Sequence, residues 1–300
     1  MMTALTPEDR AAMFVEVLPY IKELCGKTVV VKYGGNAMAN EELKRAVAFD
    51  LVFLKSIGAN PVVVHGGGPD INQMMARIGK KPAFVSGLRI TDPETMEIVQ
   101  MVLCGKLNKE IVSLIGDEGG RAIGISGHDA RLIRARKRPP ERVVDRETGE
   151  EQLVDLGQVG DVEEIDPSIL RDLARDGYIP AVSTVGMGDD GRAYNINADY
   201  VAAEIACSLG ADVLVMLTDV EGIFGNYKDK STLIPQLSID DARAMVSDGR
   251  VEGGMIPKVQ SCIGALEGGV GRAHIIDGRR PHSIILELCT HAGIGTELVP

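Results

Sequence analysis

The sequence predicts an α/β fold: a mostly parallel, open sheet sandwiched by helices, with a β-hairpin excursion and a kinked N-terminal helix. Short apolar segments rich in valine and isoleucine alternate with longer segments of helical periodicity. Two of the apolar segments run directly into glycine turns, at Gly34-Gly35 and at 66–68. The alternation indicates parallel strands joined by helices, and the glycine turns indicate ligand sites at the strand ends.

Composition limits the classes of protein that this chain can represent. Its 300 residues, 45% hydrophobic and 25% charged, suffice for a large core and two lobes. It has no run of roughly 20 apolar residues and no signal peptide, so we expect a cytoplasmic protein without a membrane partner. The net charge of -11 disfavours nucleic-acid binding. Five scattered cysteines without CxxC spacing predict free thiols, and the sequence shows no metal-ligand pattern.

The first expected element is an amphipathic helix from Pro7 to Leu24. Met13, Val17 and Tyr20 share one face at helical spacing. Pro19 removes a backbone hydrogen bond and should kink this helix. The apolar face could dock on its own domain, or it could pair with the same helix of another subunit.

The following elements alternate as a parallel sheet requires. The sequence predicts a strand at 28–33, a helix at 41–57, a second strand ending at His65 and a helix at 69–79. The segment Thr91-Asp-Pro-Glu94 has the spacing of a capping box, so it should open another helix.

Strands return in the second half of the chain. Three are expected at 122–126, 179–185 and 213–218. The last strand is expected at 274–277 or at 283–288. A helix starting near Asn197 and running to Leu209 should precede the third of these strands.

A charged segment interrupts the alternation. Residues 131–138 are strongly basic and 141–166 strongly acidic, with turn signals at Pro139-Pro140 and Thr148-Gly149. Opposite charges can pair across strands, so we expect two or more antiparallel excursions beside the main sheet. Nucleic-acid contact by the basic run is the alternative, but its acidic neighbour would repel phosphates.

Charged residues at the ends of the expected elements form a candidate anion site. Lys32 ends an apolar strand, where a lysine is costly to desolvate unless an anion or carboxylate meets it. Asp199 lies at the start of an expected helix, and Lys258 follows the Gly253-Gly254 turn. Glycine turns let backbone amides approach a phosphate closely. Each feature also has a structural interpretation: an ordinary strand-to-helix turn, a capped helix or a solvated lysine.

Six short motifs follow one another in a specific order. They are Val31-Lys-Tyr-Gly-Gly-Asn36, His65-Gly-Gly-Gly-Pro69, Gly87-Leu-Arg-Ile-Thr91, Asn195-Ile-Asn-Ala-Asp199, Leu217-Thr-Asp-Val-Glu-Gly-Ile223 and Gly254-Met-Ile-Pro-Lys258. This set resembles the amino acid kinase superfamily and, within it, the N-acetyl-L-glutamate kinases. The resemblance extends over nearly the whole chain, from about 27 to 296.

The resemblance implies an activity. Its members use ATP to phosphorylate the side-chain carboxylate of N-acetyl-L-glutamate, giving N-acetyl-L-glutamyl 5-phosphate in arginine biosynthesis. In-line transfer between anionic oxygens needs positioning and positive charge. The resemblance implies that Lys32 and Lys258 supply this charge and that Asp199 orients both lysines as the third catalytic residue. It implies ATP with Mg²⁺, the ion being held mainly through phosphates and water.

The resemblance also assigns binding roles and lobes. Phosphate binding falls to Gly34 and Gly35, and substrate binding to Gly67, Gly68, Arg89 and Asn195. Nucleotide binding falls to Thr218, Asp219, Gly222 and Ile223. The planar guanidinium of Arg89 would hold the α-carboxylate by two parallel hydrogen bonds. The implied parts are an N-terminal oligomerisation helix (1–27), an amino-acid-substrate lobe (28–208) and an ATP-binding lobe with a C-terminal regulatory segment (209–300).

The two ends of the chain resemble the arginine-inhibited members of the family. Those members carry a kinked N-terminal helix and form homohexamers, arranged as trimers of dimers. The segments 274–279 and 287–296 match their C-terminal pattern. This match implies feedback inhibition by L-arginine at an allosteric site formed by Lys228, His274, Glu287, Gly293 and Gly295.

Two other functions stay open at this point. A related amino acid kinase could act on glutamate or aspartate, because one sequence does not define the acyl pocket. A catalytically silent nucleotide or arginine sensor is the other alternative, although both lysines and Asp199 are present. A single ATP turnover assay separates the sensor from the enzymes.

Overall fold

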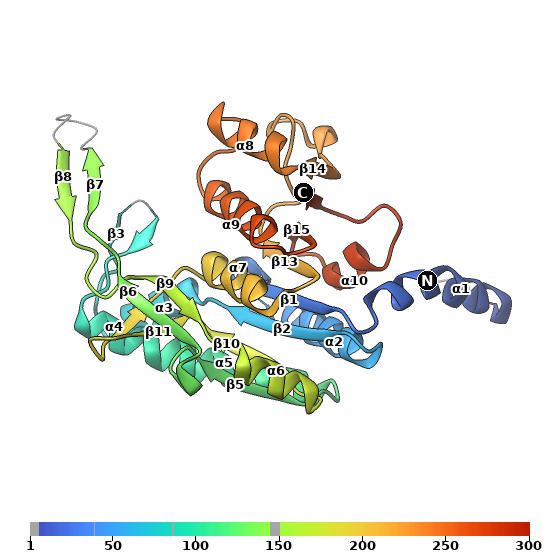
Figure 1. Ribbon diagram of the computed structural model, residues 1–300, viewed down its shortest axis with the longest axis horizontal. Helices are drawn as coiled ribbons and strands as arrows, with labels where there is room; N and C mark the ends of the chain where they lie inside the picture. The colour runs from blue at the N-terminus through green and yellow to red at the C-terminus, as the bar shows by residue number, and fades with distance from the viewer. Residues whose placement is uncertain (1–5, 39, 86, 145–150) are drawn as a thin grey trace.

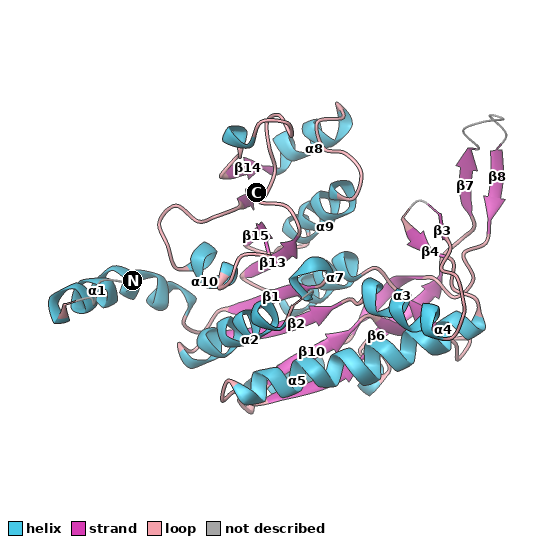
Figure 2. Cartoon of the chain, turned by 180° about the vertical axis from the view of Figure 1, so that it is seen from behind, coloured by secondary structure: helices cyan, strands magenta, loops and turns pink. Residues whose placement is uncertain are grey.

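The computed structural model describes residues 6–38, 40–85, 87–144 and 151–300. Its centre is an eight-stranded sheet with helices on both faces (Figures 1 and 2). In spatial order the strands are β14 (Gln236–Ser238), β16 (Thr296–Val299), β15 (Arg272–Asp277), β13 (Val213–Thr218), β1 (Thr28–Tyr33), β2 (Asn60–His65), β10 (Ile179–Ser183) and β5 (Ala122–Ser126). Neighbouring strands are parallel except for β15 and β16. The predicted mostly parallel α/β fold is confirmed.

Helices form a layer on each face of this sheet, because successive side chains of a strand point to opposite faces. Val31 and Val63 belong to the core on one face, and Val30 and Val64 to the core on the other. The first face is covered by α2 (Glu41–Ser56), α3 (Gly68–Arg77), α4 (Pro93–Gln100), the π-helix η2 (Met101–Leu107), α5 (Asn108–Asp117) and α10 (Ser283–Leu288). The second face is covered by α6 (Ser168–Arg175), α7 (Ala198–Leu209), α8 (Ile239–Ser247) and α9 (Met255–Glu267).

The first part of the chain and the last part form one continuous sheet. β1 pairs with β2 on one side and with β13 on the other. All strands of the main sheet from 28–208 therefore lie on one side of the β1–β13 junction, and those from 209–300 lie on the other (Figure 1). The carboxyl ends of these parallel strands meet at one edge, where ligands bind in open α/β sheets.

Helix caps explain where the key helices begin. The Asn197 side chain accepts a hydrogen bond from the Asp199 amide at 2.7 Å, so α7 starts where the sequence predicts. The capping box expected at Thr91 is one residue wrong. The side chain of Asp92 caps α4 by accepting from the Thr95 amide at 2.7 Å, because Pro93 occupies the first helical position. The Thr91 hydroxyl instead donates to the Arg89 carbonyl at 2.9 Å.

Two predicted strands differ from the structure. The segment expected as one strand at 179–185 ends at Ser183, and a new strand in a second sheet starts at Val185. Of the two candidates for the last strand near the C-terminus, 274–277 lies within β15, whereas 283–288 is the short helix α10. A short apolar run of this length does not distinguish a buried strand from a buried helical turn.

The charged excursion forms antiparallel strands, as predicted. A four-stranded sheet contains β12 (Ala193–Asn195), β11 (Val185–Gly188), β6 (Ile133–Lys137) and β9 (Gly160–Ile165). β6 and β9 are antiparallel, and Arg134 pairs with Glu164 across them at 2.8 Å. Two hairpins project from this region: β3 (Phe84–Val85) with β4 (Leu88–Arg89), and β7 (Glu141–Val144) with β8 (Glu151–Val154) (Figure 1). The predicted turn at Thr148-Gly149 lies outside the described residues.

The N-terminal helix α1 (Pro7–Leu24) has the predicted bounds and continues through Pro19. It projects from the body of the molecule (Figures 1 and 2). Its second half is anchored, since Leu24 is buried and Val17 and Tyr20 pack against the core, while Phe14 and Val15 are 77% and 71% exposed. Short 3₁₀ segments complete the chain: η1 (Gly35–Met38), η3 (Asp129–Arg131) and η4 (Lys230–Thr232). Within the described ranges, no helix combines the length and apolarity needed to cross a membrane.

Candidate active site

Two cavities meet at the carboxyl ends of β1 and β2. The larger has a volume of about 990 Å³ and the smaller about 300 Å³. They share four lining residues: Lys32, Gly34, Gly35 and Pro69. The two volumes lie within the range of about 300–1,000 Å³ that is usual for small-molecule sites. Groups bound in the two cavities would therefore meet beside Lys32.

A buried charge cluster lies in the wall between the cavities. Lys32 is on β1, Asp199 is in the first turn of α7 and Lys258 is in the first turn of α9. The two carboxylate oxygens of Asp199 lie 3.0 Å from Lys32 Nζ and 2.7 Å from Lys258 Nζ. Strand alternation explains the contact, because Lys32 points to the face that α7 and α9 cover. Lys32 and Lys258 share the one carboxylate of Asp199, so with both lysines protonated these three side chains carry one positive charge in excess. The carboxylate of Asp219 also attracts Lys32.

Burial and Coulomb attraction act in opposite directions on this cluster. Burial lowers the pKa of Lys32, and the charge of Asp199 opposes that shift. Burial alone would raise the pKa of Asp199, but the two lysines more than offset it and the net shift is downward. Asp199 is therefore ionised at neutral pH and holds both ammonium groups in place.

Glycines shape the backbone around the shared wall. Gly35 has φ of +66°, a conformation that side chains disfavour, so the chain can turn sharply after β1. A Cβ on Gly67 would lie 2.3 Å from Leu107 Cδ1, so only glycine fits between the cavity and η2. Gly68 begins α3, and helix N-terminal amides attract anions. Gly34, Gly35, Gly67 and Gly68, the glycines to which the resemblance assigns phosphate and substrate contacts, all line the smaller cavity.

Arg89 and Asn195 also line the smaller cavity. The Arg89 side chain is buried; one nitrogen donates to the Gly68 carbonyl at 3.2 Å, another lies 3.3 Å from Met75 Sδ, and the guanidinium stacks 4.7 Å from the Phe84 ring. Burial lowers the pKa of Arg89. Among residues 6–38, 40–85, 87–144 and 151–300, no carboxylate pairs with it. The cavity thus contains a desolvated guanidinium without a negative partner.

The four predicted nucleotide residues line the larger cavity: Thr218, Asp219, Gly222 and Ile223. The loop after β13 is fixed by short contacts. Thr218 Oγ1 accepts from the Val220 amide at 3.1 Å, and the Ile223 amide donates to Thr296 Oγ1 at 2.8 Å. A Cβ on Gly222 would lie 2.6 Å from Thr296 Oγ1, so this position is closed to side chains.

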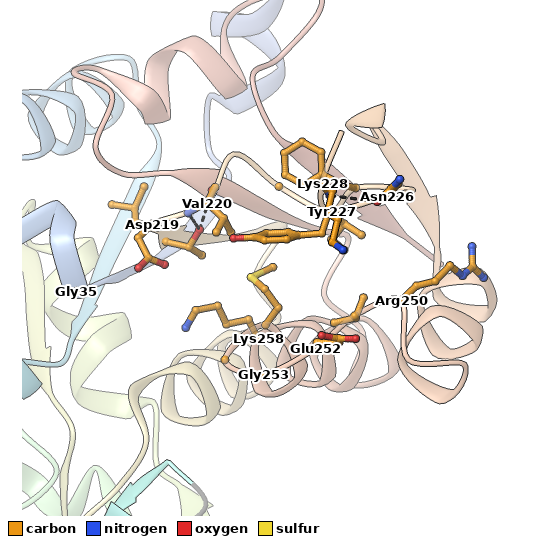
Figure 3. A pocket seen from close by; sticks show the side chains of 18 of the residues that line it. Gly35, Asp219, Val220, Asn226, Tyr227, Lys228, Arg250, Glu252, Gly253 and Lys258 are labelled. Atoms are coloured by element: carbon orange, nitrogen blue, oxygen red, sulfur yellow. Dashed lines mark hydrogen bonds between the residues drawn. The ribbon is translucent and has the colours of Figure 1, made fainter. Parts of the chain in front are cut away.

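Figure 3 shows the larger cavity, part of which sequence reasoning missed. Residues not predicted include Phe224, Asn226, Tyr227, Arg250 and Glu252. Tyr227 is 71% exposed and makes an edge contact with Phe224, so its ring stands at the mouth of the cavity. These residues lie on the loops after β13 and before α9. The only available signal was their closeness in sequence to Gly222 and Lys258.

The structure divides the predicted regulatory residues between two places. His274, Glu287, Gly293 and Gly295 lie together. His274 Nδ1 is 2.7 Å from Glu287 Oε1, and the Ile294 and Gly295 amides donate to Oε2 at 2.6 and 3.0 Å. Burial would raise the pKa of Glu287, but these hydrogen bonds outweigh it and lower that pKa. Lys228 instead lines the larger cavity.

In the part of the chain that the structure describes, no group of three or more His, Cys, Asp or Glu side chains lies close enough together to hold a metal ion.

Comparisons of sequence identify the relatives of this chain. The model of the amino acid kinase family matches residues 27–277. The acetylglutamate kinase of Heliobacterium modesticaldum is 55% identical over 288 residues, which cover 96% of this chain and 97% of that protein. The acetylglutamate kinase of Moorella thermoacetica is 52% identical over 296 residues, covering 99% of both.

Comparisons of structure agree on the fold. The N-acetylglutamate synthase of Neisseria gonorrhoeae, solved with coenzyme A and N-acetyl-glutamate, superposes with a TM-score of 0.81 at 26% identity; the match covers 97% of this chain but only 63% of the synthase. The same synthase was also solved with coenzyme A and L-arginine, and that structure has a TM-score of 0.77 at 26% identity, covering 96% of this chain and 65% of the synthase. Giardia lamblia carbamate kinase bound to AMP-PNP has a TM-score of 0.64 at 17% identity over 91% of this chain and 98% of that protein, which shows the fold alone.

The family match covers most of the chain, and the curated relatives align over nearly its full length at more than half identical residues. The chain therefore belongs to the amino acid kinase family and groups there with the acetylglutamate kinases.

Proposed function

We propose that this protein transfers the γ-phosphoryl group of ATP to the side-chain carboxylate of N-acetyl-L-glutamate, giving N-acetyl-L-glutamyl 5-phosphate in arginine biosynthesis. The observation that carries this proposal is the excess positive charge of the Lys32–Asp199–Lys258 cluster where two cavities meet. Both reactants are anionic, so this charge suits the place where they react. The names of relatives more than 50% identical support the same activity.

The three clustered residues take different roles in this reaction. Lys32 lines both cavities and stabilises the transferring phosphoryl group, while Lys258 lines the larger cavity and stabilises the leaving ADP. Asp199 orients both lysines and is not a base. A carboxylate nucleophile is already ionised near neutral pH, so no base is required. Catalysis then consists of alignment and charge stabilisation.

N-acetyl-L-glutamate occupies the smaller cavity in this proposal. The unpaired guanidinium of Arg89 binds the α-carboxylate, and Asn195 helps to hold the same portion of the molecule. The side-chain carboxylate then extends toward Lys32 and the amides of Gly67 and Gly68. A carboxylate at each end of the substrate thus meets positive charge or free amides.

ATP occupies the larger cavity. The loop from Thr218 to Ile223 borders the nucleotide, and the amides near Gly34 and Gly35 contact its phosphates. Mg²⁺ arrives with ATP and is held mainly by phosphates and water, as is usual for this ion in kinases. In this assignment 28–208 is the substrate lobe and 209–300 the ATP lobe.

We further propose feedback inhibition by L-arginine. His274, Glu287, Gly293 and Gly295 form the binding site, with Glu287 pairing with the guanidinium. Lys228 lines the larger cavity and lies outside this group. The exposed apolar residues of α1 then pair between subunits in a cytoplasmic homohexamer, a trimer of dimers. A structurally similar synthase solved with L-arginine supports the regulatory part.

A hydroxamate assay tests the proposed activity, because hydroxylamine traps any acyl phosphate. N-acetyl-L-glutamate, glutamate, aspartate and carbamate should be compared side by side with ATP and Mg²⁺. We expect product with N-acetyl-L-glutamate at a kcat/KM far above that of the other acceptors. Preference for glutamate or aspartate would replace the proposed substrate, and ATP binding without turnover would indicate a sensor.

A further inference from the structure

A chain of buried polar groups lies behind the glycine loop of the smaller cavity. His65, the last residue of β2, is 0% exposed and follows the strand alternation to the face covered by α5. Its Nδ1 lies 3.1 Å from the Gly66 carbonyl oxygen, and its Nε2 lies 3.1 Å from Asn108 Nδ2. Asn108 is the first residue of α5 and is 1% exposed. Neither side chain lines either of the two cavities, so neither would touch a reactant bound there directly.

The partners of these groups determine where the protons are. A carbonyl oxygen only accepts, so His65 Nδ1 carries the hydrogen and Nε2 presents a lone pair. One hydrogen of the Asn108 amide fills that lone pair, and the other is donated to the Ala181 carbonyl at 2.9 Å. Asn108 Oδ1 accepts from Lys109 Nζ at 3.0 Å. Burial lowers the pKa of His65 to about 4, which agrees with a neutral ring at neutral pH.

The π-helix η2 brings this chain and the glycine loop together. The π-helix inserts a residue relative to α-helical spacing, a feature often found near functional sites. Leu103 and Leu107 of η2 pack beneath Gly67, where a Cβ would lie 2.7 and 2.3 Å from them. Asn108 follows at once and points to His65. The Asn108 side chain has room there because Gly124 has no side chain; a Cβ on Gly124 would lie 1.9 Å from Asn108 Oδ1.

The geometry of one peptide group connects this chain to the cavity. The carbonyl of Gly66 and the N–H of Gly67 belong to the same trans peptide and point in opposite directions. Because His65 holds the carbonyl toward the core, the N–H of Gly67 points away from the core. Gly66 and Gly67 line the smaller cavity, and the Gly67 N–H has no acceptor within the described ranges.

We propose that His65 and Asn108 are positioning residues that fix the Gly66–Gly67 peptide, so that the Gly67 N–H is aimed at the reacting oxygens between the two cavities. This inference rests on the proposed phosphoryl transfer. A donor fixed before reaction costs no reorganisation in the transition state, so a misaligned peptide lowers kcat more than it weakens substrate binding.

Two substitutions at His65 separate its two nitrogens. In His65→Asn the amide nitrogen takes the place of Nδ1 and keeps the donor to Gly66, whereas His65→Gln keeps a group at the Nε2 position and loses that donor. We expect kcat to fall on the order of ten- to a hundredfold in His65→Gln, and KM for each substrate to change by less than about threefold. His65→Asn should retain most of the turnover. Equal losses in kcat from both variants, or wild-type kcat in His65→Gln, would overturn the proposal.

A remote substitution tests Asn108 without changing the loop. Gly124→Ala puts a methyl group against Asn108 Oδ1, while Gly116→Ala in α5 meets open space and serves as the matched control. Gly124→Ala should lower kcat several-fold with KM nearly unchanged, and Gly116→Ala should leave both unchanged. Unfolding by urea shows how much of each population is folded. A loss of stability in Gly124→Ala with unchanged kcat of the folded enzyme would assign Asn108 a structural role only.

A measurement independent of activity completes the test. Nitrogen-15 NMR of the histidine-labelled wild-type protein reports which nitrogen of each ring carries the proton. We expect His65 to show the Nδ1–H form and no titration between pH 5 and 8. An Nε2–H form, or titration in that range, would overturn the inference whatever the substrate proves to be. If the hydroxamate assay shows another acceptor, the proposed substrate is wrong. The positioning inference is then tested by the same kinetic comparison with that acceptor.

Discussion

Two buried carboxylates in this protein sit in opposite electrostatic settings. Asp199 lies between two lysine ammonium groups, at 3.0 and 2.7 Å, in the wall of the smaller cavity. Glu287 lies against His274 and two backbone amides, away from both cavities. Hydrogen bonds or charges lower the pKa of both groups, so both are ionised near neutral pH. What differs is the charge that each cluster has left over.

The leftover charge selects the sign of the ligand. The Asp199 cluster has one positive charge in excess, which suits phosphates. Around Glu287 the balance is negative, histidine aside, because a second carboxylate, that of Glu297, lies 3.8 Å from His274. The cation Arg272 lies 3.9 Å from Glu297 but pairs more closely with Glu23, at 2.8 Å. A negative balance suits a guanidinium. Residues of similar type therefore leave opposite charges in the two regions, as the proposed phosphate site and the proposed arginine site each require.

The prediction with the largest expected effect removes one of the two lysine charges beside Asp199. We expect Lys32→Ala and Lys258→Ala each to lower kcat on the order of a hundredfold or more, with a smaller effect on KM for ATP, because the charge acts most strongly in the transition state. Lys27→Ala is a matched control, since Lys27 precedes the same strand but pairs with Asp212 at the surface. Steady-state kinetics with both substrates provide the measurement. A variant with near wild-type kcat would remove that lysine from the mechanism.

The next test keeps the positive charge at position 89 and removes the planar shape of the guanidinium. Arg89→Lys preserves the positive charge of the smaller cavity but loses the planar fork that binds a carboxylate through two hydrogen bonds. KM for N-acetyl-L-glutamate should rise at least roughly tenfold while KM for ATP stays nearly constant. Equal effects on both constants would show that Arg89 supports the loop through its contacts with Gly68 and Phe84.

The same contrast shows what sequence can predict. Lys32 and Asp199 were predictable because each lies at a recognisable boundary, the end of a strand and the capped start of a helix. The carboxyl ends of parallel strands lie at one edge of the sheet, so the topology brings such positions together. The antiparallel strands of the charged segment were predictable, because basic and acidic residues pair across them, as Arg134 does with Glu164. Tyr227 and its neighbours were not, because loop residues carry no periodic signal and their place depends on how the chain folds back. The helix cap is Asp92, one residue after the predicted Thr91, because Pro93 favours the first helical position.

A test of intermediate size concerns the cluster at Glu287. Glu287→Gln removes the negative charge proposed to pair with L-arginine, so the arginine concentration for half inhibition should rise roughly fivefold or more while kcat without arginine stays constant.

A truncation tests the proposed role of α1 in assembly. Removing 1–16 deletes only part of α1 and leaves the buried Leu24 in place. We expect this truncation to break the proposed hexamer into dimers and also to weaken the proposed inhibition, as sedimentation and arginine titration would show. Full-length protein that stays dimeric and ignores millimolar arginine would contradict the regulatory proposal.

The smallest effect is on stability and has a defined pH dependence. In the folded state the pKa of Glu287 lies below its ordinary value of 4.5, so its ionised form contributes stability that is fully present above about pH 4.5 and is lost as pH falls through the folded pKa. Glu287→Gln keeps the shape but replaces charged hydrogen bonds by neutral ones. We expect the variant to be less stable than wild type by about 1–2 kcal/mol at pH 7, with the difference shrinking below pH 4.5.

Urea unfolding at several pH values measures this difference directly. The excess positive charge around Asp199 gives a contrasting control, because Asp199→Asn leaves the buried Lys32 and the partly buried Lys258 without their counter-charge, and breaking a buried pair costs about 3–5 kcal/mol. If Glu287→Gln instead destabilised the protein as much as Asp199→Asn, Glu287 would be balancing a buried cation. The negative balance assigned to its cluster would then be wrong, and with it the reason to expect a guanidinium there.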